Sequence, residues 1–178
     1  GSITGCVNNG DILNKHTGVW AIGGIVGNTN AREVDMKPNI ATCANYGDIS
    51  VMNTTSTSSP MGVGGIAGRL HGAKLSECTN EGSISSVCNV LTGIGGIAGI
   101  HALEYESIID KCVNGAKEKT DKGLLTFNPS EGTEQMVLGG ILGYSKDYKG
   151  KLTVSACDNH APITTSYACL RNIGGICG

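Results

Sequence analysis

Large aromatic side chains are scarce in this chain of 178 residues, which contains one Phe, one Trp and five Tyr. A broad aromatic core is therefore excluded. Ile, Val, Leu and Ala are instead spread along the whole sequence, and side chains of this size fill a narrow interior better than a wide one. We expect a slender fold with an aliphatic core.

Clusters of one charge sign are also missing. Lys and Arg together number 13 and Asp and Glu 15, which gives a formal net charge of −2. Nucleic-acid-binding proteins carry basic patches that neutralise phosphates, so we expect no nucleic-acid partner. No apolar run approaches the roughly 20 residues of a membrane span, so we expect no direct membrane insertion.

Metal-binding spacings are absent as well. The sequence contains neither Cys-x-x-Cys nor His-Glu-x-x-His, which are common signatures of zinc sites. The four histidines are scattered along the chain. We therefore expect neither a metal site nor a cofactor.

Glycine is abundant, with 28 residues, and it recurs in a fixed motif. A hydrophobic residue followed by Gly-Gly-Ile-x-Gly occurs five times, with the glycine motif at 23–27, 64–68, 95–99, 139–143 and 174–178. A second motif, an aliphatic residue, two spacers and Cys-x-Asn, occurs once before each copy. The cysteines of this motif are 37, 35, 34 and 45 residues apart, so a period near 35 residues carries one insertion, between Gly115 and Gln135.

This alternation predicts that residues 1–178 are a single repeat domain, which we expect to be a segment of a longer protein. Within each unit the apolar residues are one or two positions apart and are interrupted by Gly and Asn, which is typical of short strands. We also expect strand and loop at 101–111. The units start near Ile3, Ile40, Leu75, Ile109 and Val154.

A unit of short strands cannot bury its apolar face alone, whereas parallel stacking of the copies gives a continuous core. The sequence therefore predicts an all-β fold, a parallel β-solenoid (β-helix-like) of about five repeats, with equivalent residues about 4.8 Å apart along the axis. The alternative is an antiparallel β repeat or prism. In the solenoid, the isoleucine of each glycine motif points inward, at Ile25, Ile66, Ile97, Ile141 and Ile176.

Stacking also predicts two structural ladders. The motif asparagines would hydrogen bond to one another along the axis, and the motif cysteines would form a buried column of reduced thiols, because side chains in one register point the same way. Cys88, Cys169 and Cys177 lie outside this register and could pair with one another. The ladder residues are Asn8, Asn45, Asn80, Asn114 and Asn159, and Cys6, Cys43, Cys78, Cys112 and Cys157.

The alternating motifs resemble the GLUG repeat of bacterial surface and secreted proteins, which include some immunoglobulin A metallopeptidases and adhesin-like proteins. The resemblance is carried by 63–68 (Val-Gly-Gly-Ile-Ala-Gly) and 75–84 (Leu-Ser-Glu-Cys-Thr-Asn-Glu-Gly-Ser-Ile), with isoleucine where leucine is usual. It implies an exported parent protein at the bacterial cell surface or in the extracellular space. It implies no catalytic residue in this segment.

Segments that interrupt the period are free to carry binding residues. They are 28–39, 50–61, 116–135 and 144–151. Aromatic side chains in such segments suit recognition of a host glycan or protein ligand, so the candidates are Phe127, Tyr144 and Tyr148. Alternatively, Phe127 caps one side of the coil together with Leu124 and Leu125.

We expect no enzymatic activity: the chain would be an adhesin-like binding module or a structural spacer. One alternative is an enzyme that acts on polysaccharide, with Glu104, Glu106 and Asp110 as the candidate carboxylates, although such a group also suits a solvated loop. Another is an accessory segment of an immunoglobulin-cleaving peptidase. Because both ends of a solenoid are open sheet edges, end-to-end self-association is a further expectation.

Overall fold

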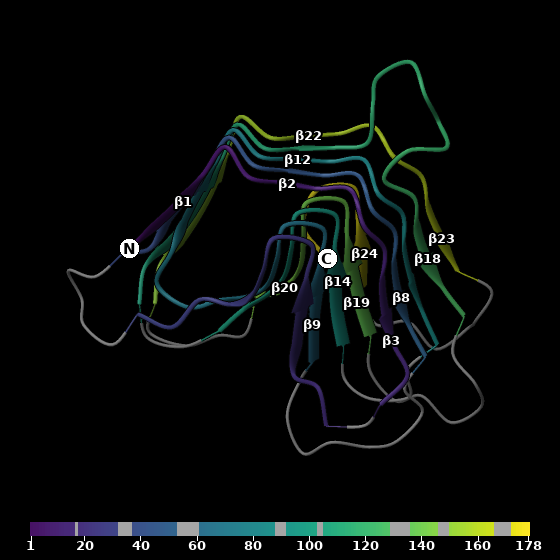
Figure 1. The fold of residues 1–178 in the computed structure, drawn as a ribbon, viewed down its shortest axis with the longest axis horizontal. Coiled ribbons are helices and arrows are strands. Elements are labelled where there is room, and N and C mark those ends of the chain that lie inside the picture. The colour runs from purple at the N-terminus through teal and green to yellow at the C-terminus, as the bar shows by residue number, and fades with distance from the viewer. Residues whose placement is uncertain are drawn as a thin grey trace.

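The computed structural model contains β-strands and no helix in the residues that it describes, which are 1–16, 18–31, 37–52, 61–87, 92–102, 105–128, 136–145, 150–165 and 172–178. The strands form five parallel sheets, and each successive turn of the chain adds one strand to each sheet, except that the fifth turn adds only an isolated bridge to the last sheet. Five coils are stacked in this way, and in Figure 1 they overlie one another along the line of sight. The prediction of a parallel β-solenoid is therefore confirmed.

We name the sheets A to E in the order in which a coil passes through them. Sheet A contains β1 (Ser2–Thr4), β6 (Asn39–Ala41), β11 (Lys74–Ser76), β16 (Ser107–Asp110) and β21 (Leu152–Ser155). Sheet B contains β2 (Val7–Asn8), β7 (Ala44–Asn45), β12 (Thr79–Asn80), β17 (Val113–Asn114) and β22 (Asp158–Asn159). Sheet C contains β3 (Ile12–Asn14), β8 (Ile49–Val51), β13 (Ile84–Ser86), β18 (Leu125–Phe127) and β23 (Ile163–Thr165).

Sheets D and E are formed by the strands on either side of the glycine motif. Sheet D contains β4 (Ala21–Gly23), β9 (Met61–Gly64), β14 (Thr92–Gly95), β19 (Met136–Gly139) and β24 (Asn172–Gly174). Sheet E contains β5 (Val26–Asn28), β10 (Ala67–Leu70), β15 (Ala98–His101) and β20 (Leu142–Ser145), and Cys177 forms a bridge to Leu142. Coil 1 thus comprises β1–β5, coil 2 β6–β10, coil 3 β11–β15, coil 4 β16–β20 and coil 5 β21–β24.

The corner between sheets A and B is built on a left-handed backbone conformation. The residue before each motif cysteine has a φ between 50° and 64°. Glycine adopts this conformation readily, whereas other residues are strained in it. Only the first coil has glycine there; the residues in order are Gly5, Thr42, Glu77, Lys111 and Ala156.

The glycine motif turns the chain back through the middle of each coil, so that sheets D and E lie back to back inside the solenoid (Figure 1). Glycine is required at this seam because the two backbones nearly touch. A Cβ atom added to Gly64 would lie 2.7 Å from the backbone nitrogen of Gly99, and one added to Gly95 would lie 2.6 Å from that of Gly143. The recurring glycines therefore permit a sheet-to-sheet approach that side chains would block.

This internal pair of sheets divides the interior into two hydrophobic cores. The core between sheets A and E includes Ile66, Ile97 and Ile141, as predicted for the motif isoleucines. Ile25 is partly buried against the same core, whereas Ile176 is 38% exposed, because it lies in the last described coil. The core between sheets C and D includes Ile49, Ile84, Ile94, Leu125, Phe127 and Leu138.

The predicted asparagine ladder is present where sheet B faces the glycine turn. Nδ2 of each motif asparagine donates to Oδ1 of the asparagine in the next coil, at 2.8 Å for the first three bonds and 2.9 Å for the fourth. The second glycine of each motif abuts this ladder: a Cβ on Gly65 would overlap Asn80, and one on Gly96 would overlap Asn114. The two sequence motifs alternate because they pack against each other.

The insertion of coil 4 leaves the solenoid at the corner between sheets B and C. Gly115 and Gly123 both have positive φ, and residues 116–122 form a turn between them that projects at the upper right of Figure 1. After this turn the carbonyl of Gly123 accepts a hydrogen bond from Asn114 Nδ2 at 3.1 Å, as Gly82 does from Asn80 in coil 3. The insertion therefore leaves the ladder intact.

Candidate functional site

The motif cysteines form a column beside the asparagine ladder. The backbone nitrogen of Ala44 donates to the carbonyl of Cys6, and this pattern repeats in every coil. Cys43, Cys78 and Cys112 are buried, and all six cysteines in the described part of the chain are free. Thiol–thiol hydrogen bonds and burial raise the pKa of Cys112, and burial raises that of Cys43. Hydrogen bonds with Cys112 lower the pKa of Cys78 and that of Cys157 to about 7. The column therefore packs as free, hydrogen-bonded thiols of unequal acidity.

The cysteines outside the column are only partly described. Cys177 is an exposed free thiol that occupies the first sheet E position of coil 5. Cys88 and Cys169 lie outside the described residues. A pairing among these three stays a prediction.

The candidate carboxylates are engaged with other side chains. Glu106 forms an ion pair with Lys37, whose ammonium group lowers the pKa of the carboxyl. Asp110 accepts a hydrogen bond from Ser155 Oγ at 2.7 Å. Glu106 and Asp110 are four residues apart, and four residues of extended chain span roughly 13 Å. This distance exceeds the separation of the two catalytic carboxyl groups in glycosidases. Glu104 lies outside the described residues. The structure thus gives Glu106 and Asp110 separate structural partners.

The aromatic candidates have different positions. Phe127 is only 1% exposed and belongs to the core between sheets C and D. The expectation that it is an exposed binding residue is wrong, because β18 directs it into the core that the buried Leu125 also lines. Tyr144 is half-buried at the end of β20. Tyr148 lies outside the described residues.

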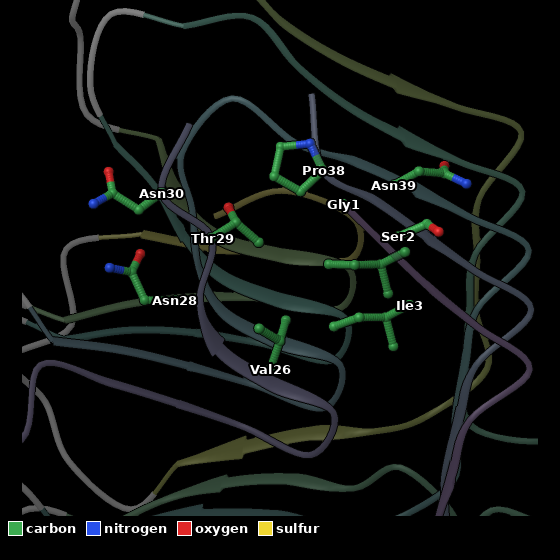
Figure 2. A pocket seen from close by; sticks show the side chains of 10 residues that line it. Gly1, Ser2, Ile3, Val26, Asn28, Thr29, Asn30, Pro38 and Asn39 are labelled. Carbon is green, nitrogen blue, oxygen red and sulfur yellow. The ribbon is translucent and has the colours of Figure 1, made fainter. Parts of the chain in front are cut away.

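Two cavities lie on opposite sides of the segment that follows β5. The first has a volume of about 280 Å³ and lies between the ends of sheets A and E in coil 1. Figure 2 shows Ile3, Val26 and Thr29 turned toward it, while the side chains of Asn28 and Asn30 point to the other side. Asn28 and Asn30 also line the second cavity, a groove of about 180 Å³.

The groove brings together side chains from coils 1, 2 and 3. It is lined by Trp20, Asn28, Asn30, Arg69, His71 and Ala102. We call it the Trp20 groove. Trp20 is the chain's single tryptophan and is 54% exposed. One aromatic wall with several converging polar groups is the usual composition of a small-molecule site. The groove is therefore the candidate functional site.

The polar wall of the groove is positioned by the parallel pairing of coils 1 and 2. Asn28 of β5 is paired with Arg69 of β10, so their side chains are neighbours on adjacent coils. The next pair along the chain is joined by a hydrogen bond of 3.1 Å between Asn30 Oδ1 and His71 Nδ1. Thr29, between them, accepts a hydrogen bond from the backbone nitrogen of His71 at 2.8 Å. These bonds fix the wall formed by coils 1 and 2.

A glycine links the aromatic and cationic walls. The carbonyl of Trp20 accepts a hydrogen bond from the backbone nitrogen of Gly62 at 3.0 Å. A Cβ atom on Gly62 would lie 3.1 Å from Cγ of Arg69, so the absence of a side chain there leaves room for the arginine. Gly62 therefore positions both residues.

A buried histidine lies next to the groove. His101 is 1% exposed, and its Nδ1 is 3.2 Å from Ser145 Oγ. Its Nε2 makes no hydrogen bond of good geometry, although the backbone of Tyr105 is close enough to raise its pKa slightly. Burial has the larger effect and lowers the pKa of His101, and the nearby His71 lowers it further. His101 is therefore neutral near pH 7.

This burial predicts a pH-dependent stability. In the unfolded chain His101 takes up a proton near its ordinary pKa of 6.5, whereas the folded state resists protonation. The unfolded state then binds more protons, so the free energy of unfolding falls as pH decreases below about 6.5, by at most about 1.4 kcal/mol per pH unit for one group. Urea unfolding between pH 7.5 and 5 measures this slope. His101→Gln should reduce it and the exposed His160→Gln should not; equal slopes in all three proteins would contradict the prediction.

No group of three or more His, Cys, Asp or Glu side chains in the described ranges is arranged to hold a metal ion. The same ranges include no helix that is long and apolar enough to span a membrane.

A comparison with protein-family models identifies the repeat unit. The model that matches is that of the GLUG motif, and it covers 59–85. Residues 59–85 are a GLUG motif. The matched segment runs from the sheet D strand of coil 2 to the sheet C strand of coil 3, so a GLUG motif here is one coil that starts at the internal pair of sheets. No curated protein and no solved structure matches the chain.

Sequence reasoning missed the Trp20 groove. The glycine and cysteine motifs and their ladders repeat the same residue types. Arg69 and His71, by contrast, stand at the first and third positions after a glycine motif, where coil 1 has Asn28 and Asn30, so no residue type recurs at these positions. The one available signal was the single tryptophan, because an unrepeated large aromatic residue in a chain of small side chains has no role in stacking.

Proposed function

We propose that this GLUG-motif repeat module is a non-catalytic, adhesin-like binding module of an exported bacterial protein, displayed at the cell surface or secreted. Its ligand is a glycan of the host, held in the Trp20 groove. The solenoid is the rigid support, and the residues that interrupt its regularity supply the binding groups.

The observation that carries this proposal is the composition of the groove. Sugars present an apolar ring face and a rim of hydroxyl groups. Trp20 offers an exposed aromatic face on which the apolar ring face can stack. Asn28, Asn30 and Arg69 offer amide and guanidinium donors to the hydroxyl groups. The volume of about 180 Å³ is below that of sites for drug-sized ligands and suits one sugar ring.

Retention of the purified chain on an array of host glycans, mucins and immunoglobulins tests the proposal. We expect specific retention on glycans and glycosylated proteins. Trp20→Ala should weaken it about 10-fold or more, because central aromatic side chains dominate binding energies. Tyr46→Ala is the matched control, since Tyr46 is a similarly exposed aromatic residue, at 48%, outside the groove.

The array also separates the alternative functions. Retention that is equal in the wild type and in Trp20→Ala, or that is absent, would contradict the proposal. Cleavage of a retained glycan would instead support a polysaccharide-acting enzyme, and cleavage of immunoglobulin would support a peptidase function. End-to-end self-association through the open strands of coils 1 and 5 is also proposed, and a molecular mass equal to the 18.2 kDa of the monomer at both low and high protein concentration would exclude it.

A further inference from the structure

We propose that the Trp20 groove is selective for a sugar ring that bears a carboxylate, an inference that rests on the glycan-binding function proposed above. The chemical class includes N-acetylneuraminate and the hexuronates.

The cationic character of the groove points to an anionic ligand. Among the described residues that line the groove, Arg69 and His71 are the titratable ones, and none is a carboxylate. In the part of the chain that the structure describes, the ion pair is between Lys37 and Glu106, so no described carboxylate pairs with the Arg69 guanidinium. An arginine at a groove wall without an acidic neighbour is available to a ligand, and its planar fork matches a carboxylate in a bidentate manner.

Local geometry holds this arginine in place without using its charge. The backbone carbonyl of Arg69 accepts a hydrogen bond from Thr29 at 3.1 Å, and its aliphatic stem passes over Gly62. The guanidinium group is thus carried to the groove by the strand and by packing of the stem. A group that is positioned before binding loses less entropy when the ligand arrives.

The amides on the neighbouring coil complete the match to such a ring. Asn28 lies beside Arg69 through the register of β5 and β10. Asn30 is oriented by its bond to His71, which leaves its NH₂ group to donate. Amide donors next to a guanidinium suit a carboxylate that is attached to a ring rich in hydroxyl groups. Trp20 then covers the ring face, and the anionic group is directed toward coil 2.

Fluorescence titration tests this selectivity directly, because Trp20 is the only tryptophan and its emission reports on the groove alone. The titrants are N-acetylneuraminate and glucuronate, compared with the neutral N-acetylglucosamine and glucose. We expect the acidic sugars to bind at least about 10-fold more tightly than the neutral ones, since hydrogen bonds to charged groups are roughly twice as strong as those between neutral groups. We also expect binding of the acidic sugars to weaken with added salt.

Arg69→Gln should raise the dissociation constant of the acidic sugars about 10-fold or more and leave that of the neutral sugars unchanged. Arg69→Lys keeps the positive charge but lacks the planar guanidinium group that binds a carboxylate in a bidentate manner, so it should raise the dissociation constant of the acidic sugars by an intermediate amount. Lys74→Gln is the control, because it removes an exposed cation outside the groove. Thermal unfolding of each variant verifies that it is folded. If Arg69→Gln does not fold, the affinities of the wild type for acidic and neutral sugars still test the selectivity for a carboxylate.

Failure of the inference and failure of the proposed function give different results. Equal affinity for acidic and neutral sugars would overturn the selectivity for a carboxylate and leave glycan binding standing. A selectivity that persists in Arg69→Gln would overturn the role of Arg69. No change in Trp20 emission with any sugar, together with no retention on the glycan array, would overturn both.

Discussion

Replacement of Asn80 by alanine is expected to lower the free energy of unfolding by about 3 kcal/mol or more. Asn80 is fully buried and lies at the centre of the ladder, where its Nδ2 donates to Gly82 and to Asn114 and its Oδ1 accepts from Asn45. Alanine would leave Asn45 and Asn114 each with an unsatisfied buried polar group, at about 1–3 kcal/mol each, and would also create a cavity. Urea unfolding monitored by circular dichroism measures the loss.

The ladder provides its own control for this prediction. Asn8 is the first residue of the ladder and is only partly buried, so water can replace some of the hydrogen bonds that its side chain makes. Asn8→Ala should therefore cost about 1 kcal/mol, the usual value of one hydrogen bond. Equal losses for Asn8→Ala and Asn80→Ala would show that the ladder is not the buried, continuous network described above.

Replacement of Gly96 by alanine is expected to destabilise the protein by about 3 kcal/mol or more. The added Cβ would overlap the side chain of Asn114 and the backbone carbonyl of Gly140. A backbone atom in a stacked coil cannot move without disturbing its neighbours, so the overlap costs more than ordinary overpacking, which is about 1–3 kcal/mol. Denaturant unfolding measures the difference from the wild type.

A substitution at the equivalent glycine of coil 5 shows whether the loss of stability comes from steric overlap or from the change in backbone freedom. Gly175 occupies the same motif position, but a Cβ added there has no atom within 4 Å. Gly175→Ala should therefore change the free energy of unfolding by less than about 1 kcal/mol, in either direction. A Gly96→Ala variant as stable as Gly175→Ala would contradict the close packing of the glycine turn against the asparagine ladder.

The sequence predicted the features that depend on stacking. A residue type that recurs in one register must lie in one column of a parallel solenoid, so Asn45, Asn80 and Asn114 could be placed together before any coordinates were known. The same argument placed Ile66 and Ile97 in the core. Strict repetition was the information that made these predictions reliable.

Features within one coil could not be derived in this way. The glycine motif predicted a sharp turn, but the back-to-back packing of sheets D and E also depends on Gly64 and Gly99 belonging to different coils. The left-handed corner before each cysteine had a glycine signal only at Gly5, because Glu77 and Lys111 adopt the same conformation under the constraint of the stack.

The candidate binding residues were the least predictable part. The position of Phe127 in the insertion leaves open whether it is an exposed binding residue or packs on the coil; the chain returns to the coil at Gly123, and β18 places Phe127 in the core. The Trp20 groove depends on the register between β5 and β10 and on the loop that precedes β4. The register follows from the glycine motifs at 23–27 and 64–68, whereas the loop has no sequence pattern of its own.

The most direct test of this account is a heteronuclear NMR titration of the 178-residue chain with N-acetylneuraminate, in which backbone and side-chain N–H resonances are followed. We predict shifts at the indole of Trp20, the Arg69 side chain and the amides of Asn28 and Asn30, and none at the buried amide of Asn80. Shifts confined to the outer faces of sheets A to C would contradict a binding module whose site is the Trp20 groove. No shifts at any concentration of N-acetylneuraminate would contradict the selectivity of this groove for a sugar that bears a carboxylate.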